Sequence, residues 1–173
     1  DLATRVLTTA AREQAAGKLE AAAAGKRAAL LLSERALAAP SAGELSPVVR
    51  RRLQSTAASL HEELGEVEPA LALYRAVLKD APDVVSARAG VARLLERQGK
   101  ASEARVLWDE IIATPPGKPG WMEAHYQSAR LSLALGDQAR ACAVLRKVPT
   151  DMLLNANAET PKKIQEMLRA CSA

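Results

Sequence analysis

The side chains that could support catalysis or bind a metal are few and widely spaced. The chain of 173 residues has two histidines, His61 and His125, and two cysteines, Cys142 and Cys171. Neither histidine has an acid–base partner at a motif spacing, and the cysteines match no zinc-ligand or thioredoxin pattern. The sequence also has no glycine-rich phosphate loop, nucleophile elbow or His-Glu-x-x-His motif. We therefore expect no catalytic residue, no metal site and no cofactor.

The two cysteines allow two interpretations. They are either two buried thiols or a disulfide that fixes the last helix of the chain. A disulfide between Cys142 and Cys171 would close a loop of about 30 residues and contribute on the order of 3 kcal/mol. It would also favour the periplasm over the cytoplasm, because disulfides persist in oxidising compartments. Counting free thiols separates the two interpretations, and the compartment itself is left unassigned.

The elements that carry these side chains are predicted to be helices throughout. Apolar residues recur at i, i+3 and i+4, and no alternation of β-branched residues persists. Glycines mark tight turns at Gly65, Gly99 and Gly136, and Pro82 follows the end of a helix. The predicted helices span about 2–23, 26–38, 47–64, 67–80, 84–98, 101–113, 120–135, 138–148 and 161–171.

The chain repeats itself at a spacing of 34 residues between Leu64 and Pro116. The matching positions are Leu64-Gly65 with Gln98-Gly99, Ala70 with Ala104, and Tyr74 with Trp108. A third copy at Gly136 and Ala141 is displaced by 37 residues, because a short insertion at 117–120 intervenes. A fixed period of this length is typical of stacked helical repeats, in which each unit buries its apolar face against its neighbours.

Residues 48–149 resemble the tetratricopeptide repeat family. In that family a helix pair turns at a glycine, carries a small residue early in the second helix and an aromatic four residues later, and ends near a proline. The matching residues of the first two units are Ala70, Tyr74 and Pro82, then Ala104, Trp108 and Pro116. The resemblance implies an all-α, right-handed α-solenoid of antiparallel helix pairs. Small residues would lie where two helices cross, and aromatics would fill the space between units.

The resemblance also implies three parts within one continuous domain. They are a degenerate N-terminal helical pair and linker at 1–46, three repeats at 47–149 (about 51–84, 85–118 and 122–149), and a C-terminal capping helix at 150–173. In that cap, Ile164, Met167 and Leu168 form the apolar stripe. A terminal element of a repeat array needs a polar outer face for solubility. The N-terminal pair could instead contact a second copy of the chain.

One position of the first helix departs from the family pattern in all three units. The family usually has a large aromatic there, whereas this chain has Gln54, Arg88 and His125. Either the units are packed less well on that side, or another group fills the space. Trp121, just before the third unit, is the candidate to fold over the gap.

A concave groove lined by the first helices is a further implication of the resemblance. The positions that are exposed in the groove of the family correspond in this chain to the candidate partner-binding residues Ser55, Ser59, Glu62, Arg93, Arg97, Tyr126 and Arg130. Arg93 and Arg130 share one position in adjacent units, so their guanidinium groups are expected side by side, which suits an acidic group on a ligand. Tyr126 is the groove aromatic and a candidate anchor. Alternatively, both arginines merely pair with Glu62, Glu96 or Glu123.

Composition limits the class of partner. With two Trp, two Tyr and no Phe, the chain has few rings for stacking on RNA bases. The net charge of +4 is dispersed, and its densest cluster, Arg50-Arg51-Arg52, is interpreted as a solvated helix start or end. The longest apolar run, Ala28 to Leu32, is far too short for a membrane span. A nucleic acid partner is therefore disfavoured.

These features predict a non-catalytic scaffold that binds a peptide segment or a partner domain, which could carry acidic groups. A place in a bacterial envelope, secretion or exopolysaccharide-export assembly follows from family analogy alone. Two alternatives stay open. The chain could be a homo-oligomerising structural module, or it could bind an anionic polymer, either polysaccharide or nucleic acid, through its groove arginines.

Overall fold

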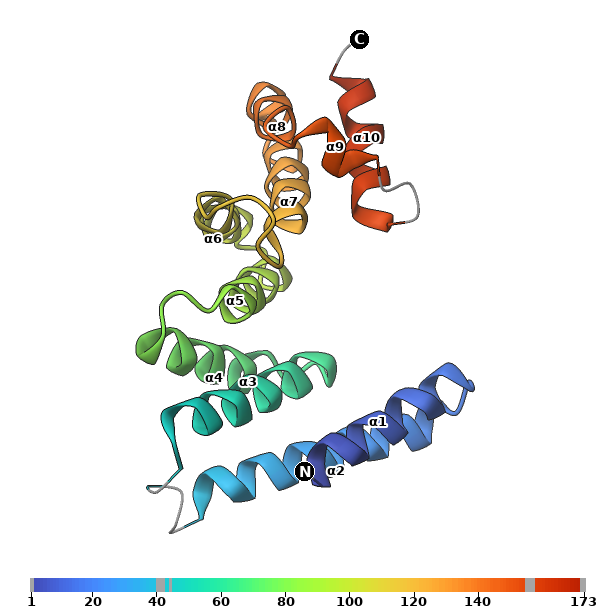
Figure 1. Cartoon of the computed structure of the whole chain (residues 1–173), viewed down its shortest axis with the longest axis vertical. Coiled ribbons are helices and arrows are strands. Elements are labelled where there is room, and N and C mark those ends of the chain that lie inside the picture. Colours follow the sequence, from blue (N-terminus) through green and yellow to red (C-terminus); the bar gives the residue numbers. More distant parts are fainter. Residues whose placement is uncertain (1, 40–42, 44, 155–157, 172–173) are drawn as a thin grey trace. The chain divides into compact units, whose positions relative to one another are not determined.

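The computed structural model describes residues 2–39, 43, 45–154 and 158–171, and these residues form helices and turns without any strand (Figure 1). The helices are α1 (Leu2–Ala15), α2 (Leu19–Ala38), α3 (Pro47–Glu63), α4 (Val67–Asp80), α5 (Val85–Arg97), α6 (Ala101–Ile112), α7 (Trp121–Ala134), α8 (Gln138–Leu145), α9 (Thr150–Leu153) and α10 (Glu159–Ala170). The all-α class predicted from the sequence is confirmed. No helix in the described part of the chain is both long and apolar enough to cross a bilayer.

The chain divides into two compact units, residues 1–90 and 91–173, and the boundary falls inside α5. In the first unit α1 packs on α2, α2 on α3, and α3 on α4. In the second unit α7 packs on α6 and α8, and α10 packs on α7, α8 and α9. Both units are thus built from pairs of helices that are consecutive in the sequence.

The first hairpin turns at a different glycine from the one that the sequence suggests. The predicted break at residues 24–25 is wrong, because α1 ends at Ala15 and the turn contains Gly17, which has a φ of 75°. Gly25 lies inside α2 instead. A Cβ added there would stand 2.8 Å from the Cβ of Ala10, so Gly25 allows α1 and α2 to approach closely.

The third helix begins with two local signals that its sequence provides. The Ser46 hydroxyl accepts a hydrogen bond from the backbone N–H of Val49 at 3.4 Å, and Pro47 occupies the first turn, where its missing N–H costs nothing. Further along, α3 packs on α2 through a small apolar cluster. Its buried members are Ala29, Leu30, Ala57 and Leu60.

The small residues of the repeat pattern lie in the core, as predicted. Ala70, Ala104 and Ala141 are each 0% exposed, so a larger side chain has no room at these positions. Tyr74 and Trp108 are also buried. The Tyr74 ring packs so closely on α5 that a Cβ at Gly90 would lie 2.4 Å from two of its ring carbons.

The core of the second unit lies between α7, α8 and the C-terminal helices. Its buried members are Trp121, Ala129, Ala141, Val144, Leu145, Val148, Leu153 and Ile164. Met167 and Leu168 pack against this cluster, so the predicted apolar stripe of the last helix does face the core. The short helix α9 was not predicted, because its four residues give no helical period in the sequence.

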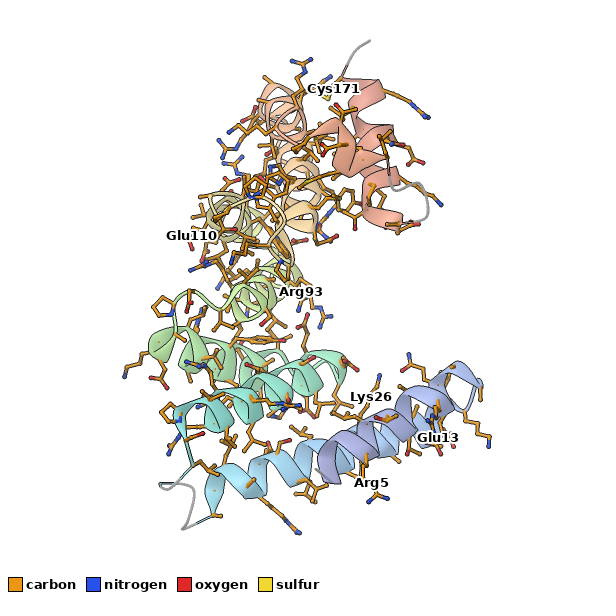
Figure 2. All side chains as sticks on the ribbon, in the orientation of Figure 1. Arg5, Glu13, Lys26, Arg93, Glu110 and Cys171 are labelled. Carbon is orange, nitrogen blue, oxygen red and sulfur yellow. A yellow bond between two sulfur atoms is a disulfide. The ribbon has the colours of Figure 1, made fainter. Side chains whose placement is uncertain are left out.

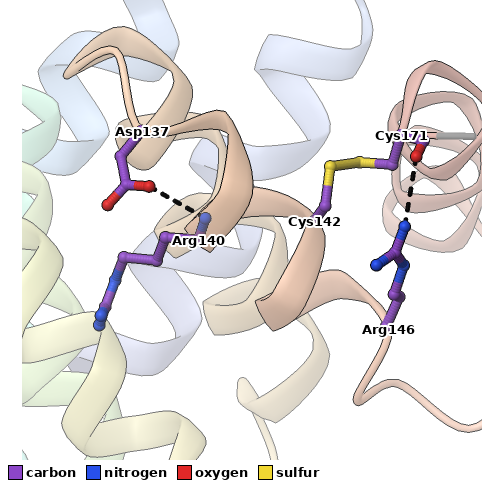
Figure 3. Close-up of a disulfide and its surroundings, with 5 residues drawn as sticks. All are labelled: Asp137, Arg140, Cys142, Arg146 and Cys171. Carbon is purple, nitrogen blue, oxygen red and sulfur yellow. Dashed lines mark hydrogen bonds between the residues drawn. A yellow bond between two sulfur atoms is a disulfide. The ribbon is translucent and has the colours of Figure 1, made fainter. Parts of the chain in front are cut away.

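A disulfide joins Cys142 in α8 to Cys171 at the end of α10 (Figure 3). The two Cα atoms are 5.6 Å apart, and Arg146 donates a hydrogen bond to the backbone oxygen of Cys171 at 3.3 Å. Of the two interpretations that the sequence leaves open, the structure has the disulfide. It links the cap covalently to the second helix of the third repeat.

Candidate partner-binding site

Four of the candidate partner-binding residues lie in the second unit, on α5 and α7, which are the first helices of the second and third repeats. Arg93 and Arg97 lie on α5 and are exposed, and Figure 2 labels Arg93 among the side chains of the chain. Tyr126 and Arg130 lie on α7 and are half-buried. These helices therefore present both charged and aromatic side chains within one compact unit.

A continuous chain of hydrogen bonds crosses this surface. The Trp108 indole donates to Oε1 of Glu96 at 3.1 Å, and Arg130 forms an ion pair with the other oxygen of the same carboxylate. Arg130 Nε donates to Oε1 of Gln127 at 2.8 Å, and the Gln127 amide donates to Oε1 of Glu123 at 2.6 Å. These bonds fix the Arg130 guanidinium in one orientation.

The last helix extends this network and covers one end of the surface. The Thr160 hydroxyl donates to Oε2 of Glu123 at 2.9 Å, and the Lys163 ammonium lies 5.6 Å from the centroid of the Tyr126 ring. Tyr126 also packs against the core cluster of this unit. The candidate anchor is thus already in contact with α10 of its own chain.

For Arg130 the structure shows the pairing that the sequence offered as the alternative. Its guanidinium is directed at Glu96, which lies one turn beyond Arg93 on α5. The two carboxylate oxygens of Glu96 are both in use, one by Trp108 and one by Arg130. Arg130 is consequently part of the internal network before any partner binds.

The other three candidates belong to the first unit and differ from the groove expectation in one respect. Ser55 and Ser59 on α3 are half-buried. The expected exposure of Glu62 is wrong, since Glu62 is only 6% exposed and accepts a hydrogen bond from the Tyr74 hydroxyl at 3.0 Å. That bond satisfies a buried carboxylate, which would otherwise be costly.

Sequence reasoning missed the glutamate–aromatic pairs as a repeated feature. Glu62 with Tyr74 and Glu96 with Trp108 are the same pair, 34 residues apart, and in each the glutamate precedes the aromatic by 12 residues. The periodic spacing was visible in the sequence and could have identified the pairs. The roles of Gln127 and Thr160 had no such signal, because the positions that correspond to Gln127 in the other two repeats are Thr56 and Gly90, and Thr160 lies outside the repeats.

Both histidines are buried, and each contacts polar groups of its own chain. Nδ1 of His61 lies 2.5 Å from Oε2 of Glu66, and its Nε2 lies 3.1 Å from Oε1 of Glu34, so the ring connects α3 with α2 and with the residue that precedes α4. In the described part of the chain no group of three or more His, Cys, Asp or Glu side chains could hold a metal ion. His61 is therefore part of the packing of α3.

His125 and Trp121 occupy the gap that the sequence indicates in the third repeat. The two ring centroids are 3.9 Å apart, and Nδ1 of His125 lies 2.9 Å from the backbone oxygen of Trp121. The backbone oxygen accepts, so Nδ1 carries the proton and Nε2 is left as an acceptor. Nε2 is buried without a hydrogen-bond partner, and so is Oε1 of Gln54 at the equivalent position of the first repeat.

Burial lowers the pKa of His125 below its ordinary value of 6.5, and the nearby Lys147 lowers it further. The bond to the Trp121 backbone and the charge of Asp109 act in the opposite direction but are weaker than burial. The folded protein therefore holds this imidazole neutral at a pH where the unfolded chain already binds a proton.

We expect His125 to make folding sensitive to mild acid. Below about pH 6.5 the unfolded state gains a proton that the folded state resists, so the free energy of unfolding should fall by up to about 1.4 kcal/mol per pH unit. Urea titrations at pH 7.5 and 5.5 would measure this loss. In His125→Gln the difference in the free energy of unfolding between the two pH values should shrink by that amount. An unchanged difference would show that His125 is not the group responsible for the acid sensitivity.

The second unit contains the part of the chain that matches a known family model. Residues 123–151 match the model described as tetratricopeptide repeat, and this match spans α7, α8 and the start of α9. A curated relative, cellulose synthase operon protein C of Pseudomonas fluorescens (strain SBW25), is 34% identical over 91 residues. The alignment covers 53% of this chain and 7% of that protein, so the chain corresponds to a small part of the relative's length.

Solved structures with the same fold come from several organisms. A putative kinesin light chain with TPR-like repeats from Podosopora anserina superposes with a TM-score of 0.66 at 19% identity, covering 95% of this chain and 82% of that one. A thermophilic TPR protein from Thermus thermophilus gives 0.59 at 19% identity, covering 98% and 82%. A TPR protein from Parabacteroides merdae ATCC 43184 gives 0.59 at 16% identity, covering 96% and 58%. At these identities the likeness shows the fold.

Proposed function

We propose that this chain, whose helix pairs have the tetratricopeptide repeat fold, is a non-catalytic scaffold that binds a segment of another protein. The binding surface is the face of α5 and α7 in the second unit. Arg93 and Arg97 supply exposed positive charge there, and a partner segment with acidic side chains would complement it. Repeat folds of this kind commonly use such extended surfaces for recognition.

The observation that carries this proposal is the fixed orientation of Arg130. Glu96 and Gln127 hold its guanidinium in place, so binding would cost less side-chain entropy than at a free arginine. The Arg130 side chain is still 41% exposed, which leaves part of the guanidinium open to a ligand. A prepositioned, partly exposed arginine, held by a glutamate on the helix that also carries the exposed Arg93 and Arg97, suits a carboxylate on a partner.

A role in exopolysaccharide assembly is the more specific form of the proposal. It is supported by the likeness to cellulose synthase operon protein C, whose name connects that relative with cellulose synthesis. In this form the chain is one part of a longer scaffold that holds components of a bacterial envelope assembly together. The disulfide between Cys142 and Cys171 suits an oxidising compartment such as the periplasm.

Reversing the charge of Arg93 and Arg97 should weaken the binding of an acidic partner. The double variant Arg93→Glu, Arg97→Glu is expected to lower affinity for a labelled, extended acidic peptide about tenfold or more at low salt, because two attractive charges become repulsive. Fluorescence anisotropy at two salt concentrations would measure the loss. Arg130 is unsuitable for this test, since Arg130→Glu would place a second carboxylate against Glu96 and disturb the fold.

A matched control makes the same change in net charge on α10. Lys162→Glu, Arg169→Glu alters two exposed cations that the hydrogen-bonded network does not include. This control should bind the acidic peptide like the natural chain. If the control loses as much affinity as the Arg93 and Arg97 variant, the attraction depends on net charge alone and the proposed surface is wrong.

A further inference from the structure

The last turn of α7 carries a leucine on its outer surface. The Leu133 side chain is 44% exposed, although it belongs to a helix that packs on α6, α8 and α10. In the part of the chain that the structure describes, Tyr126 of the same helix packs against the core cluster of this unit, whereas Leu133 does not. Leu133 therefore adds apolar surface that the core of its own unit does not use.

Leu133 shares one face of α7 with Arg130. Residues three or four positions apart on a helix lie on the same face, with their Cβ atoms about 5–6 Å apart. The residues of α7 that are not buried follow this spacing and form a single stripe. They are Met122, Glu123, Tyr126, Gln127, Arg130, Leu133 and Ala134.

The last helix covers the beginning of this stripe and leaves its end accessible. Thr160 donates a hydrogen bond to Glu123, and the Lys163 ammonium lies 5.6 Å from the centroid of the Tyr126 ring. Further along the stripe, the side chain of Arg130 is 41% exposed and Leu133 is 44% exposed. A partner can therefore contact the guanidinium and the leucine together.

The repeat register gives no packing reason for a leucine at this position. Glu62 and Glu96 occupy the equivalent position of the first two repeats, and each accepts a hydrogen bond from the aromatic side chain of its own repeat. In the third repeat Leu145 replaces that aromatic, and a leucine has no N–H or O–H to donate. The lost donor accounts for the absence of a glutamate, but it does not require an exposed apolar side chain. Leu133 beside a guanidinium suits a partner that is both acidic and apolar.

We infer that Leu133 determines which acidic segments bind: the partner carries an aliphatic side chain two residues from the carboxylate that pairs with Arg130. In an extended segment, side chains two residues apart point to the same side and are separated by about 6–7 Å. That separation is close to the distance between neighbouring positions on the face of α7. The inference rests on the proposed function and specifies its ligand as an acidic residue and an aliphatic residue with one residue between them.

Two peptides of identical composition, with both ends capped, provide the test. In the first, leucines lie two positions from a central aspartate on both sides (Leu-Ser-Asp-Ser-Leu), and in the second they lie next to it (Ser-Leu-Asp-Leu-Ser). The symmetric placement makes the result independent of the direction in which the peptide lies. Nuclear magnetic resonance of isotope-labelled leucine methyl groups gives the dissociation constants. We expect the first peptide to bind about fivefold more tightly and to shift the methyl signals of Leu133.

Two leucine variants assign the preference to one side chain. Leu133→Ala should make the two peptides bind equally, because the contact that distinguishes them is gone. Leu135→Ala is the matched control, since Leu135 is 42% exposed but lies outside the stripe, and it should keep the fivefold preference. Both changes remove exposed atoms, so circular dichroism should show the helical content of the natural chain in each variant.

The possible failures separate this inference from the proposed function. If both peptides bind the natural chain with equal affinity, or if Leu133→Ala keeps the preference, Leu133 does not select the partner, while binding of acidic segments stands. If neither peptide binds at up to about 10 mM, the inference is wrong and the proposed function loses its support as well.

Discussion

Removing the disulfide between Cys142 and Cys171 is expected to lower the free energy of unfolding by about 3 kcal/mol. The two cysteines are separated by 29 positions in the sequence, and cross-linking them restricts the unfolded chain over a loop of that length. A loss of about 3 kcal/mol is a large share of the free energy of unfolding of a natural domain, which is typically about 5–15 kcal/mol. The effect should appear in the second unit, because both cysteines lie there.

Two comparisons separate the cross-link from the loss of side-chain volume. Reduction of the natural chain breaks the bond but keeps both sulfur atoms, whereas Cys142→Ala, Cys171→Ala also removes atoms at a site that is 7% exposed for Cys142. Urea unfolding should show a large loss for both, slightly larger for the alanine pair. Equal midpoints for the oxidised and reduced protein would show that the cross-link contributes nothing.

The same reduction should loosen the cap before the rest of the unit. Without the cross-link, α10 is still held by the packing of Ile164, Met167 and Leu168. Hydrogen bonds from Thr160 to Glu123 and from Gln165 to the backbone oxygen of Leu153 also remain. Local unfolding begins where few buried contacts hold an element. Hydrogen exchange of α10 amides should therefore accelerate on reduction more than exchange in α7. Loosening of α10 would also expose Tyr126, because in the oxidised protein the Lys163 ammonium lies over its ring.

The repeat period made most of the fold predictable from the sequence. A helical period combined with glycine turns at Gly65, Gly99 and Gly136 located the helix pairs, and these glycines do have positive φ values of 81°, 76° and 80°. The same register assigned Ala104 and Trp108 to the core, where both are buried. The period and the turn residues predict the helix pairs correctly because each repeat packs on its neighbours through equivalent positions.

The N-terminal hairpin lay outside that register, and there the prediction failed. Gly17 and Gly25 are equally plausible turn residues when only local propensity is considered. Gly25 proved to be a contact point, because its missing side chain admits Ala10 of the neighbouring helix. That role depends on which residue lies opposite, which a single unrepeated helix pair does not reveal.

The repeat register predicted which arginines of α5 are exposed, but it did not predict how the candidate side chains are hydrogen-bonded. The register correctly placed Arg93 and Arg97 at exposed positions on α5. It could not show that Glu62 turns inward to Tyr74, or that Arg130 reaches Glu96 on another helix. A long side chain can reach several possible partners. Which of them it binds depends on distances in the folded protein that the spacing of residues in the sequence does not determine.

Gly90→Ala is expected to destabilise the protein, although alanine is the better helix former. In an open helix the change would stabilise by about 1 kcal/mol. Here the new Cβ would lie 2.4 Å from two carbons of the Tyr74 ring. The ring is buried, and its hydroxyl is bonded to Glu62, so it has little freedom to move away. We expect a net loss of about 1–3 kcal/mol in urea unfolding.

A second mutation at Tyr74 should reverse the sign of this effect. In a Tyr74→Leu background the ring is gone, so Gly90→Ala should become neutral or stabilise by up to about 1 kcal/mol. The coupling energy between the two positions then measures how tightly the aromatic fills the space between α4 and α5. If Gly90→Ala destabilises both backgrounds equally, the clash lies elsewhere. The glycine would then be required for a reason other than the approach of Tyr74.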